Sequence, residues 1–524
     1  MNLTNRIIHF IKYFPACFSG FILTMSFPKI SFSLLAWIGL VPLLISISKM
    51  NRKQSFYAGL LTGMCHFLSL LYWITPTVQT YGNLPLFLAF PILVLLSFYL
   101  SLYLGIFTLI FKSFKQNSIL TPFKAAALWT SLEYIRSFCF TGFPWGSIGY
   151  SQYMQIDLIQ VADITGIYGI SFLIVLFNSG VCASFFMVGF YNKKVRIKKI
   201  ISLFFCIFFI IGAVLIYGKI RLQDIDKAIL KAPRKNITVV QGNISQHVKW
   251  DKSFKENIVK KYCNLFQNIS HNNINETTDL VILPETALPF YYLNNKKLSS
   301  IVNKCIKKTQ TSFLLGSPAF EYKNNKAIFY NRAYMINKSG VITGKYDKIH
   351  LVPFGEYVPL EDYFFFLGKI ITHAGNFSSG EKNIQPLIFK DTNLGVLICF
   401  EIIFPELSAD IVKNGADILV TITNDAWFGF SSAPLQHFSM SVFRAVENRR
   451  ALVRSANTGI SGFIDPVGRV IQRTNLFKEQ VITKSVPCLK LKSFYTYYKD
   501  VFAKGCIIIS LIMIVFSLFN RKNS

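Results

Sequence analysis

Residues 394–406 read LGVLICFEIIFPE, in which the apolar run GVLIC ends at Cys399 and is followed by Phe400 and Glu401. A continuous apolar run of this kind predicts a strand that is buried on both faces. Cys399 falls at the end of that strand, and a nucleophile held on a turn from a strand into a helix is a recurring arrangement in enzymes. A free cysteine is, however, most often only a small buried hydrophobic residue. The stretch therefore favours a layered α/β domain and leaves the role of Cys399 open.

Similar apolar segments recur through residues 225–490, separated by stretches with a helical pattern. This alternation predicts one layered α/β domain whose functional residues lie at strand ends. The expected strands are 236–241, 279–285, 311–319, 333–340, 394–401, 416–425, 451–459 and 461–466. The expected helices are 252–270, 294–308, 404–414 and 434–449.

The composition of the whole chain excludes a disordered protein, because 52% of its 524 residues are hydrophobic and only 15% are charged. Its formal net charge of +29 would suit a nucleic-acid partner. In an apolar chain, basic residues more often mark the cytoplasmic loops of a membrane protein. Residues 1–220 hold 16 Lys and Arg against 3 Asp and Glu, whereas the remainder holds 39 against 23. We therefore place a domain boundary near residue 220 and expect no nucleic-acid partner.

The first part of the chain consists of long apolar runs, and a membrane span needs about 20 mostly apolar residues. We predict eight transmembrane helices, near 8–25, 32–48, 56–75, 85–111, 124–141, 163–190, 200–218 and 503–519. This divides the chain into a membrane domain (1–220), a catalytic domain (221–495) and a C-terminal span with a tail (496–524).

Basic residues occur in alternate loops, for example in KKVRIKK (193–199), whereas the opposite loops carry almost none. The positive-inside rule then predicts that both termini are cytoplasmic and that the catalytic domain lies outside the cytoplasm. Glu133 and Arg136 lie near the fifth span, where a charge suggests function by default. Their i, i+3 spacing favours a self-neutralising helical pair.

Two more polar residues follow apolar strands. Glu285 ends LVILPE, and Lys348 lies eight residues before Glu356. Together with Cys399 they suit acyl transfer: a carboxylate takes the thiol proton, and an ammonium stabilises the thiolate and the developing oxyanion. Each of these charges is also compatible with an ordinary solvated surface.

Other site types lack support in the sequence. There is no G-x-G-x-x-G, P-loop, CxxC or HExxH pattern, so we expect no cofactor and no metal. Four cysteines lie in the catalytic region, and an exported domain could pair some of them, but their spacing defines no framework. They are Cys263, Cys305, Cys399 and Cys488.

Four motifs, in this order, resemble the carbon–nitrogen hydrolase (nitrilase) superfamily. They are PETA (284–287), YDKIHLVPFGEYVP (346–359), LICFEIIFPE (397–406) and TNDAWFG (423–429). With the membrane flanks, the chain resembles the apolipoprotein N-acyltransferase family of bacterial envelopes over nearly its whole length. The resemblance implies an αββα sandwich with a Glu–Lys–Cys triad: Glu285 as base, Lys348 as oxyanion-stabilising cation and Cys399 as nucleophile.

The resemblance also implies supporting roles outside the triad. Glu356 and Glu401 match further glutamates of the family pattern, and Trp250 matches a tryptophan linked to substrate binding. Phe400 departs from the pattern, because tyrosine commonly follows the nucleophile. The hydroxyl group is lost at this position, while the aromatic face remains.

The implied reaction is a two-step exchange. A membrane phospholipid acylates Cys399, and the α-amine of an S-diacylglyceryl cysteine at the N-terminus of an apolipoprotein then takes the acyl group. This would be the last step of lipoprotein maturation, carried out by a monomer in the bacterial inner membrane with its catalytic domain in the periplasm.

Several alternatives stay open. The same triad would serve a membrane-tethered amidase or nitrilase, and an inactive enzyme domain could accompany a transporter or scaffold. His350, His373 and His437 compete with Glu285 as the base, and His350 would share a strand face with Lys348. Three apolar loops are expected to form lids facing the membrane. These loops are 288–293, 362–371 and 426–434.

Overall fold

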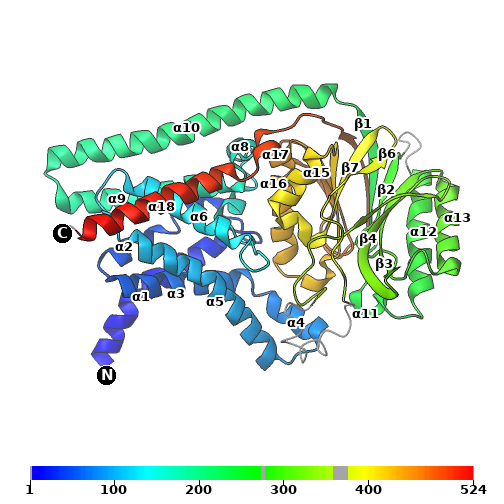
Figure 1. Ribbon diagram of the computed structural model, residues 1–524, viewed down its shortest axis with the longest axis horizontal. Helices are drawn as coiled ribbons and strands as arrows, with labels where there is room; N and C mark the ends of the chain where they lie inside the picture. Colours follow the sequence, from blue (N-terminus) through cyan, green and yellow to red (C-terminus); the bar gives the residue numbers. More distant parts are fainter. Residues whose placement is uncertain (1–2, 273–277, 358–375, 523–524) are drawn as a thin grey trace. The chain divides into compact units, whose positions relative to one another are not determined.

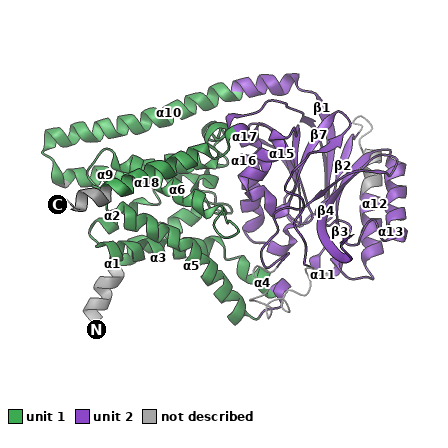
Figure 2. Ribbon diagram, viewed as in Figure 1, with its two compact units in different colours: residues 1–79, 85–222, 498–524 green, residues 80–84, 223–497 purple. Residues whose placement is uncertain are grey.

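The computed structural model describes residues 3–272, 278–357 and 376–522. It divides into two compact units (Figure 2). The helical unit comprises residues 1–79, 85–222 and 498–524, and the α/β unit comprises residues 80–84 and 223–497. Each unit is described by itself below.

The helical unit is built from long apolar helices joined by short connections (Figure 1). Its longer helices are α1 (Leu3–Met25), α2 (Val41–Ser48), α3 (Arg52–Leu70), α4 (Ile74–Gly82), α5 (Leu86–Phe111), α6 (Thr121–Arg136), α9 (Ile167–Phe190), α10 (Lys193–Lys231) and α18 (Val501–Lys522). Its short helical turns are η1 (Ser33–Trp37), η2 (Ile148–Gln152), α7 (Ile156–Ile159) and α8 (Ala162–Thr165).

Several of these helices are suited to cross a membrane. Among the described residues, α5, α9 and α10 are individually long and apolar enough, and α3 with α4 form a fourth candidate that bends by 52°. Shorter apolar helices cover residues 33–48 and 501–516. The long helices α5 and α10 also expose large apolar side chains, since Phe87 on α5 and Phe205 and Phe209 on α10 are each about 70% exposed. An apolar surface of this extent is typical of contact with lipid.

Glu133 and Arg136 do not form the expected helical pair. The Ile148 amide donates to Glu133 Oε1 at 2.8 Å, and Arg136 Nη2 donates to Ser147 Oγ at 3.1 Å. The Arg136 guanidinium also lies over the Phe67 ring. Glu133 Oε2 and Arg136 Nε are buried and have no hydrogen-bond partner among the described residues. Both side chains thus hold the turn at residues 147–148 rather than each other.

The α/β unit contains two six-stranded sheets with helices on their outer faces (Figure 1). The first sheet has the order β12-β1-β2-β3-β4-β5, with strands β12 (Gln480–Pro487), β1 (Arg234–Gln241), β2 (Leu280–Ile282), β3 (Ser312–Lys323), β4 (Lys326–Ile336) and β5 (Ile342–Asp347). The second has the order β11-β10-β9-β8-β7-β6, with β11 (Val470–Arg473), β10 (Gly462–Ile464), β9 (Ala451–Ala456), β8 (Ile418–Thr423), β7 (Thr392–Ile398) and β6 (Leu387–Phe389).

Parallel strands form the middle of each sheet, namely β1–β2–β3 in the first and β7–β8–β9 in the second. The carboxyl ends of parallel strands meet at one edge, which is where polar side chains can gather. Helices cover the outer faces: α12 (Lys255–Asn272) and α13 (Lys296–Thr309) on the first sheet, and α15 (Pro405–Lys413) and α16 (Ala433–Asn448) on the second. The remaining helical turns are α11 (Gln246–Lys249), η3 (Cys399–Ile403), η4 (Asp425–Phe428) and α17 (Phe494–Tyr498).

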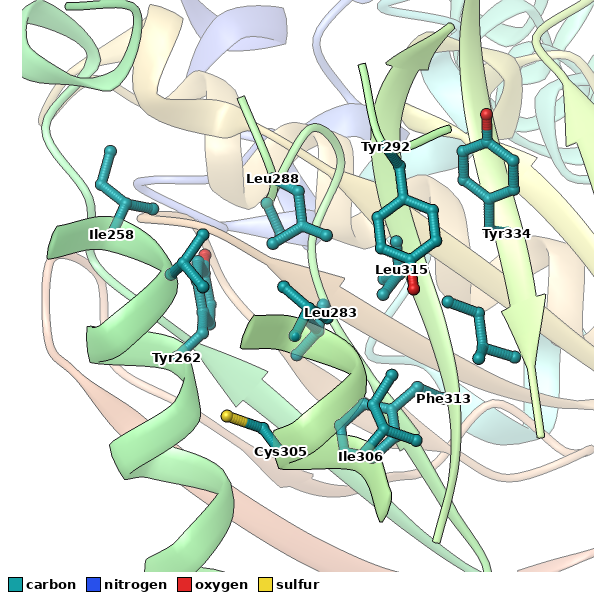
Figure 3. Close-up of a cluster of buried hydrophobic side chains, with 14 of the residues drawn as sticks. Ile258, Tyr262, Leu283, Leu288, Tyr292, Cys305, Ile306, Phe313, Leu315 and Tyr334 are labelled. Atoms are coloured by element: carbon teal, nitrogen blue, oxygen red, sulfur yellow. The ribbon is translucent and has the colours of Figure 1, made fainter. Parts of the chain in front are cut away.

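A hydrophobic core fills the space between the first sheet and its helices (Figure 3). Ile258 and Tyr262 of α12 and Ile306 of α13 pack there against Phe313 and Leu315 of β3. A disulfide between Cys263 and Cys305 joins α12 to α13. These two helices are thereby fixed to each other both covalently and by packing.

Candidate active site

Three expected site residues follow three different strands of the α/β unit. Glu285 comes just after β2, Lys348 directly after β5 and Cys399 directly after β7. All three are buried: 6% of Glu285, 1% of Lys348 and 9% of Cys399 is exposed. Charged side chains are almost never buried to this degree unless they are paired. The fold therefore brings together the groups that the sequence placed at separate strand ends.

The segment that carries Glu285 is anchored on both sides by the hydrophobic core. Leu283 and Leu288 are fully buried and point into the cluster between the sheet and its helices (Figure 3). Thr286, between them, has a positive φ of 46°, a backbone conformation that is costly for a β-branched residue. The core thus overcomes local strain to hold the Glu285 carboxylate in one place.

A compact network of charges surrounds Lys348. Its Nζ lies 2.8 Å from Glu356 Oε2 and 3.7 Å from Glu285 Oε1. Asn331 of β4 bridges the two carboxylates, donating its Nδ2 to Glu285 Oε1 at 2.7 Å and to Glu356 Oε1 at 2.9 Å. Burial lowers the pKa of Lys348, but the nearby Glu356, Glu285 and Cys399 outweigh burial and raise it well above its usual range. Lys348 is therefore held as an ammonium.

The carboxylates of Glu356 and Glu285 differ in whether they have an oxygen free to accept a proton. Both oxygens of Glu356 are engaged, because Oε1 accepts from Asn331 and Oε2 from Lys348 and the Val352 amide. Glu285 has only Oε1 engaged, and its buried Oε2 has no hydrogen-bond partner in the described part of the chain. Glu285 can therefore take a proton, whereas Glu356 is positioned to hold Lys348.

Cys399 lies on a strained turn beside this network. Its φ is +55°, in the left-handed region that a non-glycine residue rarely adopts. Burial raises the pKa of the Cys399 thiol, Glu285 raises it further, and Lys348 acts in the opposite direction. Strain of this kind is concentrated at functional sites. The thiol is thus protonated at rest and needs a base close by.

Glu401, two residues after Cys399, ties the two sheets together at the site. Its carboxylate accepts from the amides of Ile398, Ile349 and His350, and from the Tyr346 hydroxyl of β5. It is fully buried, and burial raises its pKa to about 7 despite these donors. Glu401 thus links the end of the Cys399 strand to the segment that follows Lys348.

Comparisons with known proteins place the chain in a family. Residues 19–180 match the apolipoprotein N-acyltransferase N-terminal domain, and residues 236–493 match the carbon–nitrogen hydrolase domain. The apolipoprotein N-acyltransferase of Geobacter metallireducens is 40% identical over 514 residues, which cover 98% of this chain and 96% of that protein. The chain belongs to the apolipoprotein N-acyltransferase family.

Other members of this family match over a similar extent. The apolipoprotein N-acyltransferase of Haemophilus ducreyi is 30% identical, covering 100% of this chain and 99% of that protein. The one of Haemophilus influenzae is 31% identical, covering 95% of this chain and 94% of that protein. As a member of the family, the chain is an acyltransferase, and its two-sheet unit has the αββα fold of carbon–nitrogen hydrolases.

The histidines that competed with Glu285 are placed differently. His437 Nε2 lies 3.2 Å from the carbonyl oxygen of Cys399, and its Nδ1 contacts Asp425 Oδ1 and Arg454 Nη2. Burial and Arg454 lower the pKa of His437, so the neutral ring donates from Nε2 to this carbonyl. His437 therefore supports the strained turn of Cys399 through the carbonyl of that residue.

His350 does not take the position that was expected for it. Strand β5 ends at Asp347, so Lys348 and His350 lie beyond it and do not share a strand face as expected. The His350 ring packs instead against Phe404, with ring centroids 3.8 Å apart. His373 lies outside the described residues, as does the whole of the expected lid 362–371.

The remaining expected residues lie near the site or in its flanking loops. Phe400 is half-buried and packs edge-on against Phe404, and Trp250, at the end of α11, is 39% exposed. In the loop 288–293, Leu288, Phe290 and Tyr292 are buried in the core, so these side chains do not form a lid. In the loop 426–434, Phe430 is 74% exposed and stacks on Phe477.

Three contributors to the site were not expected from the sequence. Asn331 lies inside β4, Tyr346 inside β5, and Lys249 at the end of α11, one residue before Trp250. The sequence offered a signal only for Lys249, because this residue is the neighbour of the expected site residue Trp250. Among residues 3–272, 278–357 and 376–522, no group of three His, Cys, Asp or Glu side chains is arranged to hold a metal ion.

Proposed function

We propose that this chain moves an acyl chain from a membrane phospholipid to the α-amine of an S-diacylglyceryl cysteine, at the N-terminus of an apolipoprotein, through a thioester on Cys399. The names of its relatives support an apolipoprotein as the acceptor. The observation that carries the mechanism is the unpartnered Oε2 of Glu285, in a buried site with Lys348 and Cys399. This is the arrangement that a general base, a cation and a nucleophile require.

In the first step, Glu285 takes the thiol proton and Cys399 Sγ attacks the ester carbonyl carbon of the phospholipid. A carbon–sulfur bond forms, and the tetrahedral oxyanion is stabilised by the Lys348 ammonium. The carbon–oxygen ester bond then breaks, and the proton on Glu285 passes to the leaving oxygen of the lysophospholipid. No cofactor is required, because an ester is already reactive enough for a thiolate.

In the second step, the α-amine of the acceptor attacks the thioester carbon. A carbon–nitrogen bond forms, the carbon–sulfur bond breaks, and Glu285 relays the amine proton to the departing thiolate. Glu356 keeps Lys348 charged and in place in both steps, and Glu401 keeps the Lys348 segment against the Cys399 turn. Trp250 and Phe400 contribute aromatic surface for the substrates. An apolar, shielded site would protect the thioester from water.

For the membrane, we propose the arrangement derived from the positive-inside rule. Eight spans, seven before the catalytic domain and one after it, place both termini in the cytoplasm and residues 221–495 in the periplasm. The apolar helices that the structure contains support this proposal without fixing the number of spans. We further propose that the protein works as a monomer in the bacterial inner membrane.

The test is mass spectrometry of the purified protein after incubation with phosphatidylethanolamine vesicles. We expect Cys399 to gain the mass of one acyl chain, and the signal to be discharged by a synthetic diacylglyceryl peptide with a free α-amine. Cys399→Ala should lose the adduct entirely, and Glu285→Gln should slow its formation at least about 100-fold. His437→Gln serves as the comparison for the competing base.

Two results would contradict the proposal. If Glu285→Gln forms the thioester at the wild-type rate while His437→Gln does not, the base is wrongly assigned. If the adduct is released as free fatty acid at the same rate with and without the peptide, water is the acceptor and the protein is a membrane-tethered hydrolase.

A further inference from the structure

A second lysine is buried at the site, on the short helix α11. Only 1% of Lys249 is exposed. Its Nζ donates to Thr286 Oγ1 at 2.7 Å and to the carbonyl oxygen of Glu285 at 3.3 Å. In the described part of the chain its ammonium forms no ion pair with a carboxylate, which makes it a costly group to bury.

The position of α11 is fixed from the second sheet. Asn457, just after β9, accepts from the Ile244 amide at 2.9 Å and donates to the Ile244 carbonyl at 2.8 Å. Asn424, just after β8, donates to Gln246 Oε1 at 2.8 Å. One end of the connection between β1 and α12 is therefore held by the second sheet, while Lys249 reaches the Glu285 turn of the first.

We propose that Lys249 is a positioning residue for acyl transfer, which holds the Glu285–Thr286 turn in the orientation needed for proton transfer and supplies a second positive charge beside Glu285 and Cys399. The backbone supports the first part of this role. Thr286 has a positive φ, and a strained turn persists only when its surroundings determine it. The hydrogen bonds from Lys249 to Thr286 and to Glu285 are two such constraints.

The electrostatics of the site support the second part. Burial lowers the pKa of Lys249 to about 8, while Glu285 and Cys399 act to raise it. These two residues, from the ends of β2 and β7, are the titratable groups that face it, and Lys348 lies beyond Glu285. By reciprocity, the ammonium of Lys249 favours the carboxylate of Glu285 and the thiolate of Cys399.

The test uses the full-length protein and has two readouts: thioester formation in phosphatidylethanolamine vesicles, and the alkylation rate of Cys399 by iodoacetamide in detergent without phospholipid. We expect Lys249→Met to slow thioester formation about 100-fold and alkylation at neutral pH about tenfold. Lys252→Met, an exposed lysine three residues further on, is the matched control and should leave both rates unchanged.

The pH dependence of the rate of thioester formation shows whether Lys249 acts through its positive charge or only supports the structure. Lys249 is protonated below about pH 8, so the wild-type rate should fall as the pH rises through that value. Lys249→Arg stays protonated and should move this fall to higher pH. Thr286→Val removes the acceptor that stabilises the ammonium and should move the fall to lower pH. Thr and Val have the same shape, so this variant keeps the test valid if the lysine variants fail to fold.

The inference is overturned if Lys249→Met acylates Cys399 at the wild-type rate, or if neither Lys249→Arg nor Thr286→Val displaces the fall in rate. It rests on the proposed roles of Glu285 and Cys399, which the same assay checks separately. Thioester formation at the wild-type rate in Glu285→Gln would contradict the proposed mechanism. If Glu285→Gln forms no thioester while Lys249→Met forms it at the wild-type rate, only the role of Lys249 is contradicted.

Discussion

Both units bury charged side chains, but they use them differently. In the helical unit, Glu133 and Arg136 bind the turn at residues 147–148 and leave Glu133 Oε2 and Arg136 Nε without partners. In the α/β unit, Lys348 contacts Glu356 directly, and Glu285 Oε2 has no hydrogen-bond partner in the described part of the chain. Both clusters contain buried charge, so burial alone does not mark catalysis. What distinguishes the second is a thiol on a strained turn within the same electrostatic neighbourhood.

The largest difference should appear when the cation of each cluster is removed. Lys348→Met leaves Glu285 and Glu356 close together without a counter-charge and removes the stabilisation of the oxyanion. We expect thioester formation to fall on the order of 1,000-fold, measured by mass spectrometry of Cys399 in vesicles. Lys345→Met, within β5 but half-exposed and paired with Glu321, should keep the wild-type rate. Equal rates for the two variants would remove the distinction between the clusters.

A smaller effect is expected at Glu401, which joins the two sheets rather than taking part in the chemistry. In Glu401→Gln the amide presents N–H groups to backbone donors, so at least one buried donor loses its acceptor at a cost of about 1–3 kcal/mol. We expect a lower thermal midpoint and a drop in thioester formation of about 10- to 100-fold. Glu381→Gln, at an exposed position, is the control.

The same variant, Glu401→Gln, also tests the direction in which the stability contribution of Glu401 changes with pH. The pKa of Glu401 is about 7 in the folded protein and about 4.3 in an unfolded chain, so the folded state binds the extra proton between these values. Its contribution to stability is complete below about pH 4 and is lost as the pH rises through 7. The thermal-stability advantage of wild type over Glu401→Gln should shrink over that range. A constant difference would show that Glu401 stays ionised throughout.

The smallest effect on the chemistry is expected in the helical unit. Arg136→Met removes a buried positive charge and its hydrogen bond to Ser147, and breaking a buried charged contact typically costs about 3–5 kcal/mol. We expect a clear fall in the thermal midpoint in detergent, with the thioester rate of the remaining folded protein unchanged. Lys194→Met, exposed at the start of α10, should alter neither quantity. Loss of acyl transfer without loss of stability would assign the Arg136 cluster a direct functional role.

The fold shows which structures could be predicted from sequence. All eight expected strands are present, as β1–β4 and β7–β10, because buried central strands have continuous apolar runs. The four that were missed are β5, β6, β11 and β12, and each of them forms the edge of its sheet. Edge strands have one neighbour and exposed side chains, as in β11, so their sequences carry no such run.

The residues of the candidate site also fall into two groups, those that could be predicted from the sequence and those that could not. The positions of Glu285 and Cys399 could be predicted because each follows a buried apolar strand, whereas Lys348 follows β5, which was missed, and was singled out by its motif. Asn331 and Lys249 could not, because their roles depend on contacts within the first sheet and its connections, between residues that lie 46 and 37 positions apart in the sequence. The missing ion pair between Glu133 and Arg136 has the same cause: the i, i+3 spacing describes one helix, whereas their partners belong to another segment.

The disulfide that joins α12 to α13 has a consequence for redox chemistry. Cys263 and Cys305 enclose the segment that carries Glu285, so the proposed base lies inside a covalent loop. Disulfides persist in oxidising compartments and are rare in the cytoplasm. In the proposed topology, the loop closes only after export, and Cys399 must stay a free thiol where the other two are oxidised. Its burial and raised pKa do this, because the thiolate is the form that oxidants attack.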